Sequence, residues 1–484
     1  MLQDTSRWLR MPIATLATAG LFALATVSQA AELQVGGATI TITPDKPVAL
    51  SGQFRTRIST EVESPVTATA LALESREGEK SLDQAILVSC DLVSIRDGIL
   101  EAVREKVAPR LPGFDIQKLV LSATHTHTAP VMLEGRYELP ESGIIRPAEY
   151  FDFLVNQLAS VIEQAWKSRR PGSVGWGLGH AVVAQNRRAL YAGGTAQMYG
   201  KTFRSDFQGL EGYEDHGVEV LFFWDAEGKL LATAVNVACP SQEVEGLSVV
   251  NADFWHQVRE QLRKKYGDSL LILGWTGAAG DQSPHLMFRK NAEERMRKLR
   301  GLTRLDELAR RIVAAVEEAY AGAEKERHPD AVLVHKVKQL QLPEREVTPA
   351  ELADAREQVA KLSKDPKMER RMKWNHAVIE RHERQQKSPQ LHDMELHVLR
   401  LGDVAIATNS FELFTDYGIQ MKARSRALQT FVIQLAGTGS YLPTARAVHG
   451  GSYSAIIQSN IVGPLGGQML VDETVELINS LWPE

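Results

Sequence analysis

The sequence predicts an α/β protein in which layers of mixed β-sheet are flanked by helices. Short apolar runs, typical of buried strands, alternate along the first half of the chain with segments whose apolar residues recur at helical spacing. Two longer strand-like segments are joined by Asp225-Ala226-Glu227-Gly228, which is typical of a hairpin turn. Strands that alternate with helices indicate a layered α/β architecture, although these patterns do not determine the strand order.

The first predicted strands lie at residues 85–88 and 118–123. Between them, apolar residues at helical spacing predict a helix over residues 99–107. A long helix is predicted from Pro147, because proline is favoured in the first turn of a helix. The buried face of that helix is marked by Phe151, Leu154, Leu158, Ile162 and Trp166.

The alternation of strands and helices continues through the rest of the chain. Further strands are predicted at residues 217–224, 229–237, 270–273, 394–401 and 404–408. Helices are predicted at residues 253–266 and 469–481. Gly402-Asp403 joins the last two strands and predicts a tight turn.

A charged segment from about residue 290 to 390 differs from its surroundings. It is rich in Glu, Arg and Lys, and residues 305–316 carry apolar side chains at helical spacing. Thr348-Pro349-Ala350-Glu351 is a capping box, in which the hydroxyl and the carboxylate satisfy N–H groups at the start of a helix. We interpret the segment as a charged helical insertion, partly packed and partly solvated, with a partner-binding arm as the alternative.

Residues 1–30 have the features of a secretory signal peptide. Arg7 and Arg10 precede an apolar run, and Ser28-Gln29-Ala30 supplies small residues at the positions that a signal peptidase requires. The apolar run is shorter than the roughly 20 residues that a membrane-spanning helix needs. We therefore expect cleavage after Ala30, a mature domain over residues 31–484, and a periplasmic or secreted location, with an uncleaved anchor as the alternative.

Composition and charge exclude several classes of protein. With 44% hydrophobic residues the chain can bury a large core. Its formal net charge of −5 argues against a nucleic-acid binder, which would carry a surplus of basic residues. Two cysteines, Cys90 and Cys239, are too few for a disulfide framework, and Cys90 lies in an apolar run typical of the core.

The strongest local motif contains His125 and His127, directly after a predicted strand. Side chains two residues apart on extended backbone point to the same side, so both imidazoles can address one point. Imidazole nitrogen is a common zinc ligand. A purely structural pair of hydrogen-bonded histidines is the open alternative.

Three further segments carry candidate site residues. Ser283 lies in a Gly-rich turn after the strand at 270–273, but its surroundings do not match the nucleophile elbow of serine hydrolases. Glu412 lies in an apolar stretch, where a carboxylate requires a metal, an arginine or the start of a helix. Tyr441 and Tyr453 lie in Gly-rich loops, where a phenol packs or serves a metal or an oxyanion.

Taken in order, these segments resemble the motifs of the neutral/alkaline non-lysosomal ceramidase family. That family has a T-H-T-H motif, an Asn-Arg pair, a Ser-Pro motif, a glutamate after a late strand, and two late tyrosines. This chain supplies them in the same order as His125 and His127, Asn186-Arg187, Ser283-Pro284, Glu412, Tyr441 and Tyr453. The resemblance covers the catalytic N-terminal domain of the family.

The resemblance implies a zinc site with His125, Glu412 and Tyr441 as ligands. In that family zinc activates water and polarises the amide carbonyl. Where the family places a second zinc-binding histidine, this chain has Cys239. A thiolate is itself a zinc ligand, so Cys239 is a fourth candidate. A plain buried thiol, a metal held by both motif histidines, and a site without metal are the alternatives.

The resemblance also implies roles at the substrate. His127 would act as acid/base, Ser283 would contact the reacting end of the substrate, and Tyr453 and Arg187 would line the pocket. The implied function is an exported, zinc-dependent amide hydrolase acting on an N-acyl, ceramide-like lipid, with peripheral membrane contact as a compatible property. The alternatives are the same scaffold acting on another amide, ester or sugar-linked substrate, and a non-catalytic binding protein.

Overall fold

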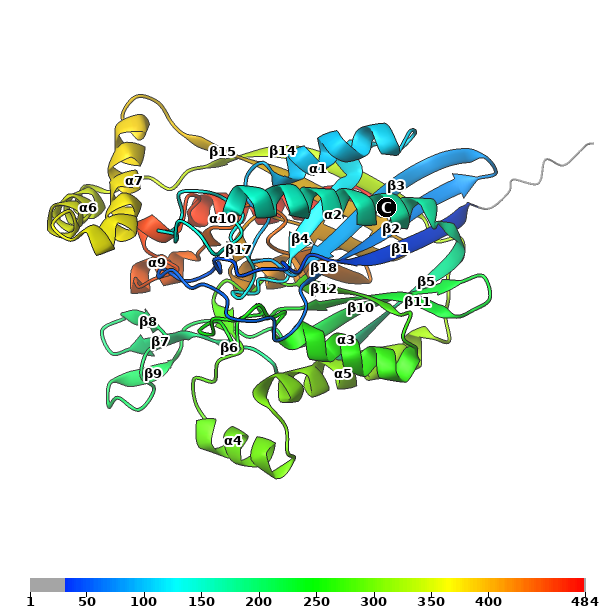
Figure 1. The fold of residues 1–484 in the computed structure, drawn as a ribbon, viewed down its shortest axis with the longest axis horizontal. Coiled ribbons are helices and arrows are strands. Elements are labelled where there is room, and N and C mark those ends of the chain that lie inside the picture. Colours follow the sequence, from blue (N-terminus) through cyan, green and yellow to red (C-terminus); the bar gives the residue numbers. More distant parts are fainter. Residues whose placement is uncertain (1–30, 483–484) are drawn as a thin grey trace, which may run out of the picture.

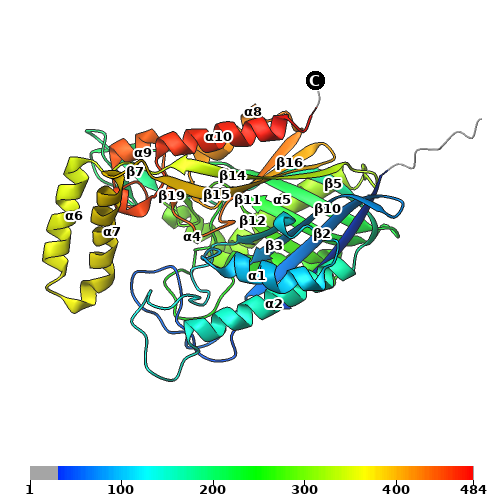
Figure 2. The same cartoon turned by 90° about the horizontal axis from the view of Figure 1, so that it is seen from above.

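The computed structural model describes residues 31–482, so the predicted signal peptide lies outside the described residues. Two β-sheets pack face to face, and helices cover their outer faces (Figure 1, Figure 2). The predicted fold class, layered mixed sheets flanked by helices, is confirmed. Among the described residues, no helix has the length and apolar character needed to cross a membrane.

The larger sheet has eight strands in the order β12-β11-β10-β5-β1-β2-β3-β4. Its strands are β1 (Glu32–Thr41), β2 (Thr67–Glu77), β3 (Lys80–Cys90), β4 (Leu119–Ala123), β5 (Arg170–His180), β10 (Gly217–Asp225), β11 (Leu230–Val237) and β12 (Leu271–Thr276). The pairs β3–β4 and β11–β12 are parallel and the other pairs are antiparallel, so the sheet is mixed.

The smaller sheet has four strands in the order β14-β15-β16-β18. They are β14 (Leu333–Pro343), β15 (Leu391–Leu401), β16 (Val404–Thr408) and β18 (Gln429–Ile433). Apolar side chains of both sheets, such as Leu221 and Phe223 of the larger and Ile406 and Phe431 of the smaller, share one buried cluster. This cluster is the central core of the molecule.

Helices complete the layers on both sides. The larger sheet is covered by α1 (Ile99–Val107), α2 (Pro147–Lys167), α3 (Phe254–Tyr266) and α5 (Arg304–Ala323), and the smaller sheet by α8 (Thr415–Arg424) and α10 (Pro464–Asn479). Helix α5 approaches β5 so closely that a Cβ atom on Gly179 would lie 2.1 Å from the carbonyl oxygen of Ala315. The glycines of β5 are therefore a packing requirement of this layer.

Short elements gather at one end of the sheets. They are β6 (Gln185–Asn186), β7 (Arg188–Tyr191), β8 (Ala196–Met198), β9 (Phe207–Leu210), β13 (Gln282–Ser283), β17 (Glu412–Leu413), β19 (Tyr441–Leu442), α4 (Lys290–Leu299) and α9 (Ala445–Gly450). The pairs β6–β13 and β17–β19 have two residues per strand. They hold loops together at the end where the candidate site residues lie.

The charged segment near residues 290–390 contributes to several parts of the fold. Helix α5 packs on β5, and β14 belongs to the smaller sheet. The remainder forms a helical hairpin of α6 (Pro349–Leu362), which begins with the predicted capping box, and α7 (Glu369–Gln385). This hairpin stands at the end of the sheets (yellow in Figure 2).

A buried histidine pair links the two sheets. His335 Nδ1 lies 3.2 Å from the Gln84 carbonyl oxygen, and His335 Nε2 lies 3.0 Å from His397 Nδ1. Burial, and then the neighbouring His397, lower the pKa of His335 well below its ordinary value. His335 is therefore neutral in the folded protein at pH values where it is protonated in the unfolded chain.

We expect this histidine to destabilise the protein in mild acid. Because the folded-state pKa is depressed, stability is fully present above the unfolded pKa of about 6.5 and is lost as the pH falls below it, by at most about 1.4 kcal/mol per pH unit. Urea unfolding from pH 7.5 to 5.0 should show a steeper loss for the wild type than for His335→Gln. The exposed His376→Gln is the control, and parallel profiles for wild type and His335→Gln would contradict the prediction.

Candidate active site

Most of the predicted site residues meet at the end of the sheets beneath the hairpin. A cavity of about 980 Å³ is lined there by His125, His127, Glu412, Tyr441 and Tyr453, among others. The histidines follow β4, and the parallel β17–β19 pairing places Glu412 opposite Tyr441. Residues separated by more than 300 positions therefore reach one cavity through the ends of the two sheets.

His125 presents one ring nitrogen to the centre of the site. Its Nδ1 lies 2.6 Å from the Val93 carbonyl oxygen, and because a carbonyl only accepts, Nδ1 carries a proton and donates it there, which leaves Nε2 directed at the site. That Nε2 lies 3.3 Å from Glu412 Oε2 and 3.2 Å from His127 Nε2. At this distance from a carboxylate oxygen, Nε2 either carries a proton or shares a cation with Glu412.

The two imidazoles converge by a different route from the one predicted. Strand β4 ends at Ala123, and His125 has a left-handed backbone with φ of 70°. The expected alternation along a strand therefore does not apply. The turn instead places the rings edge to face, with their centroids 4.7 Å apart.

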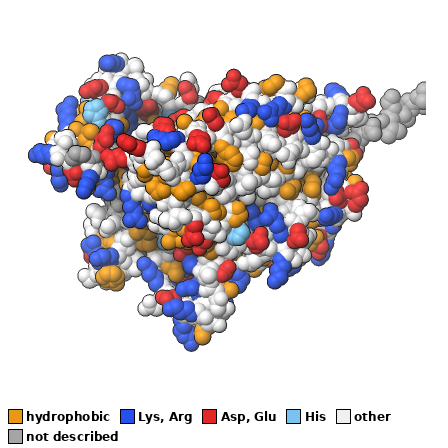
Figure 3. Space-filling view, viewed as in Figure 1, with side chains coloured by type: hydrophobic (Ala, Val, Ile, Leu, Met, Phe, Trp, Pro, Cys, Tyr) orange, Lys and Arg blue, Asp and Glu red, His pale blue; other side chains and the backbone are white. Residues whose placement is uncertain are grey.

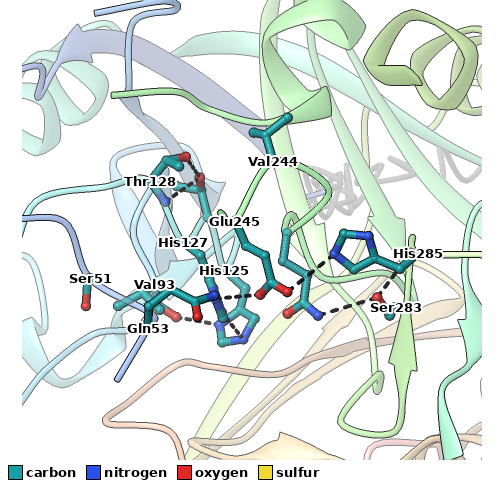
Figure 4. Close-up of polar contacts among 12 residues, drawn as sticks. Ser51, Gln53, Val93, His125, His127, Thr128, Val244, Glu245, Ser283 and His285 are labelled. Atoms are coloured by element: carbon teal, nitrogen blue, oxygen red, sulfur yellow. Dashed lines mark hydrogen bonds and ion pairs between the residues drawn. The ribbon is translucent and has the colours of Figure 1, made fainter. Parts of the chain in front are cut away.

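His127 belongs to a chain of charges that the sequence did not reveal. Its Nδ1 lies 3.1 Å from Glu245 Oε2, and Glu245 Oε1 lies 3.4 Å from His285 Nε2 (Figure 4). Burial would raise the pKa of Glu245, but the two histidines outweigh it and hold that pKa well below its ordinary value. Burial also lowers the pKa of His127. Gly52 makes room for the ring, since its Cβ would lie 2.5 Å from the imidazole.

Arg187 is not among the residues that line the cavity, but its buried guanidinium stabilises the charge of Glu412. Its guanidinium donates to the hydroxyls of Tyr441 and Tyr199, each at 3.2 Å, and to the Gly280 carbonyl oxygen at 2.9 Å. Burial would raise the pKa of Glu412, but His125, Arg187 and Tyr441 lower it to about 2. Glu412 is therefore a charged carboxylate at neutral pH.

Ser283 lies beside this network, outside the lining of the cavity. It is fully buried, and its Oγ accepts from the Tyr199 hydroxyl at 3.0 Å and from the His285 backbone N–H at 3.1 Å. Among the described residues, no imidazole or carboxylate is hydrogen-bonded to this Oγ. The structure thus places Ser283 as a support of Tyr199, which in turn contacts Arg187.

Two solved structures have the same architecture. Neutral ceramidase from Pseudomonas aeruginosa superposes with a TM-score of 0.69 at 17% identity, over 93% of this chain and 74% of that one. A ceramidase complexed with C2 gives a TM-score of 0.67 at 16% identity, over 93% and 75%. The chain has a neutral ceramidase-like fold. No protein-family model matches the sequence, and no curated protein matches it.

Within this ceramidase-like fold, Cys239 departs from the expected ligand set. The thiol is fully buried in an apolar cluster with Val237, Phe254 and Trp255, and its one hydrogen-bond partner is the Pro240 carbonyl oxygen at 3.6 Å. Burial raises the pKa of the thiol well above its ordinary value. The structure does not bring Cys239 into contact with His125 or Glu412, and its role as a ligand stays a prediction.

The other candidate donors are compatible with zinc. Two ligands of a tetrahedral zinc, each about 2.0–2.1 Å from the metal, lie about 3.3 Å apart. The distance between His125 Nε2 and Glu412 Oε2 has this value. Tyr441 adds a phenol beside Glu412, since the two residues are paired between β17 and β19. Over residues 31–482, however, no three His, Cys, Asp or Glu side chains converge as a metal-ligand group, so the phenol is needed to complete the set.

Proposed function

We propose that this protein is a zinc-dependent hydrolase that cleaves an amide bond of an N-acyl lipid. The observation that supports this best is the position of His125 Nε2 beside a cavity of about 980 Å³, 3.2 Å from His127 Nε2 and 3.3 Å from Glu412 Oε2. The structural neighbours are ceramidases, whose substrate is an N-acyl amide. In this proposal His125, Glu412 and Tyr441 hold zinc, which when bound supplies a Lewis acid for the carbonyl and lowers the pKa of water.

His127 is proposed to move the proton between water and the leaving amine. Glu245 contacts Nδ1, which fixes the ring and stabilises its protonated form, and leaves Nε2 directed at the centre of the site. A positioned imidazole of this kind is an effective general acid and base. His285 on the other carboxylate oxygen keeps Glu245 charged and in place.

Tyr453 is proposed to donate to the oxygen of the scissile carbonyl. It lines the cavity, and its ring packs edge to face on Tyr441 with centroids 5.6 Å apart. Burial, and then Glu412, raise the pKa of Tyr453 to about 12, so its hydroxyl is protonated at neutral pH. A donor that faces a developing oxyanion stabilises the transition state. Arg187 would keep Tyr441 and Glu412 in position.

Export to the periplasm or beyond the cell is part of the proposal. It rests on the basic start, apolar run and Ser28-Gln29-Ala30 site of residues 1–30. N-terminal sequencing of protein recovered from a periplasmic or culture fraction should begin at Ala31. Recovery of the unprocessed chain from the cytoplasm would argue against it.

The function is tested by metal content and amide hydrolysis in one preparation. Protein supplied with zinc should bind about one ion per chain and hydrolyse N-acylsphingosine, and a chelator should remove both properties. His125→Ala should lose both, because the central nitrogen is gone. His180→Ala, an exposed histidine outside the site, should lose neither.

The other outcomes separate the alternatives. Failure to take up zinc would overturn the metal-hydrolase proposal and favour a binding protein. Zinc uptake with cleavage of esters or sugar-linked substrates alone would favour the other substrate classes. Cys239→Ala should retain zinc if the thiol belongs to the core, and a loss of zinc would identify it as a ligand.

A further inference from the structure

The helical hairpin forms one wall of the cavity. Arg370 of α7 stacks on the rings of Tyr137 and Phe54, with its guanidinium carbon 4.4 and 5.0 Å from their centroids, and donates to the Gln53 carbonyl oxygen. Trp374 packs edge to face on Phe54 with centroids 5.5 Å apart. These contacts fix α7 over the loops that carry Phe54 and Tyr137.

Basic side chains outnumber acidic ones in the lining of this cavity. The basic residues are Arg55, Arg96, Arg136, Lys367, Arg370 and Lys373. The acidic residues are Glu138, Glu369 and Glu412. Glu412 is engaged by His125, and Glu369 forms an ion pair with Lys373 at 2.6 Å. Lys and Arg side chains are also prominent on the end of the molecule that carries α6 and α7 (left in Figure 3).

Of these six cations, Lys373 alone forms an ion pair within residues 31–482, and the other five include Arg96, Arg136 and Arg370. In the described part of the chain, no ion pair engages Arg96, Arg136 or Arg370, and Arg96 donates to the Thr438 carbonyl oxygen at 2.8 Å. Burial, and then Arg136, lower the pKa of Arg96 to about 10, and Glu412 offsets only part of this. Burial, and to a lesser extent Arg370, lower the pKa of Arg136. Arg96 and Arg136 stay charged at neutral pH, and Arg136 is repelled by both Arg96 and Arg370, with Asp97 offsetting part of this repulsion.

An anion between these guanidinium groups would relieve their repulsion. Guanidinium binds carboxylate and phosphate through paired, charge-assisted hydrogen bonds. We infer that the cavity binds an N-acyl substrate whose polar part carries an anionic group, a carboxylate or a phosphate, held by Arg96, Arg136 and Arg370. The inference rests on the proposed amide hydrolysis and narrows its substrate class, because N-acylsphingosine carries no charge.

Binding can be measured without catalysis. Octyl phosphate and 1-octanol share one apolar chain and differ in charge, so titration calorimetry on chelator-treated protein reports the anion site alone. Octyl phosphate should bind at least about tenfold more tightly than 1-octanol, and Arg136→Gln should remove most of that difference. Arg356→Gln, which removes a charge from the exposed side of the same hairpin, should have no effect. Equal binding of the two ligands would overturn the inference.

Hydrolysis distinguishes this inference from the proposed function. With zinc present, N-lauroylglycine should have a lower KM than N-lauroylethanolamine, and Arg136→Gln should raise the KM of the first alone by about tenfold. Equal KM values for both amides would overturn the inference and leave amide hydrolysis intact. Tight octyl phosphate binding without cleavage of either amide would instead overturn the hydrolase proposal. If Arg136→Gln affects only the binding of the protein to anionic vesicles, and not the KM of either amide, the arginines serve membrane contact and the inference is overturned.

Discussion

Replacing Glu412 by glutamine is expected to lower kcat/KM for amide hydrolysis by at least about a thousandfold. Glutamine has the same shape, but it lacks the charge that faces His125 Nε2 at 3.3 Å and that His125, Arg187 and Tyr441 stabilise. Zinc content should fall in parallel, because a neutral amide is a poor ligand for a divalent cation. Steady-state kinetics and metal analysis on the same preparation check the prediction.

Two variants serve as controls for the Glu412 experiment. Glu412→Asp keeps the charge on a shorter side chain and should retain more zinc than Glu412→Gln. Glu141→Gln changes an exposed carboxylate away from the cavity and should stay within about twofold of the wild type. If Glu412→Gln folds and retains a tenth of the wild-type activity, the carboxylate has no central role and the proposed ligand set is wrong.

Replacing Arg259 by methionine is expected to lower the free energy of unfolding by about 3–5 kcal/mol. Arg259 of α3 donates both terminal nitrogens to Asp91, at 2.7 and 2.9 Å, and both side chains are almost fully buried. Without the guanidinium, the carboxylate would be left in the interior with only hydroxyl and backbone partners at Thr67 and Thr124. Urea unfolding monitored by tryptophan fluorescence provides the measurement.

A double variant shows how much of this loss comes from leaving the Asp91 carboxylate buried without a partner. Asp91→Asn combined with Arg259→Met removes both charges and should recover part of the loss, since the uncompensated charge is the main cost. A loss below about 1 kcal/mol for Arg259→Met alone would contradict the prediction. Thr124, which donates to Asp91, directly precedes His125, so the same variants should also reduce activity before they unfold the protein.

Sequence reasoning found the residues that belong to motifs. His125, His127, Glu412 and Tyr441 were identified because their residue types and order matched a family, and all four line the cavity. The helix predicted over residues 99–107 has the limits of α1, and the helix predicted to start at Pro147 begins there as α2. Both predictions rest on apolar residues at helical spacing. These features depend on short-range patterns that survive in a single sequence.

The remaining features depend on contacts that no local pattern encodes. Glu245 is one acidic residue in a loop, and only the fold places it between His127 and His285. Strand β5 was missed because its glycines weaken strand character, although α5 requires them. The sequence did not indicate the packing of Trp374 and Arg370, because their partners, Phe54 and Tyr137, are more than 200 residues away in the chain.

The cavity is built from two separate parts of the fold, and this affects how its substrate selectivity can change in evolution. The floor comes from the ends of β4, β17 and β19. One wall comes from α7, which belongs to the peripheral helical hairpin outside both sheets. Exchange of residues 349–385 between homologues would alter the wall without touching the chemical groups of the floor. The scaffold therefore allows the wall of the cavity to change by recombination of one segment while the floor residues stay the same.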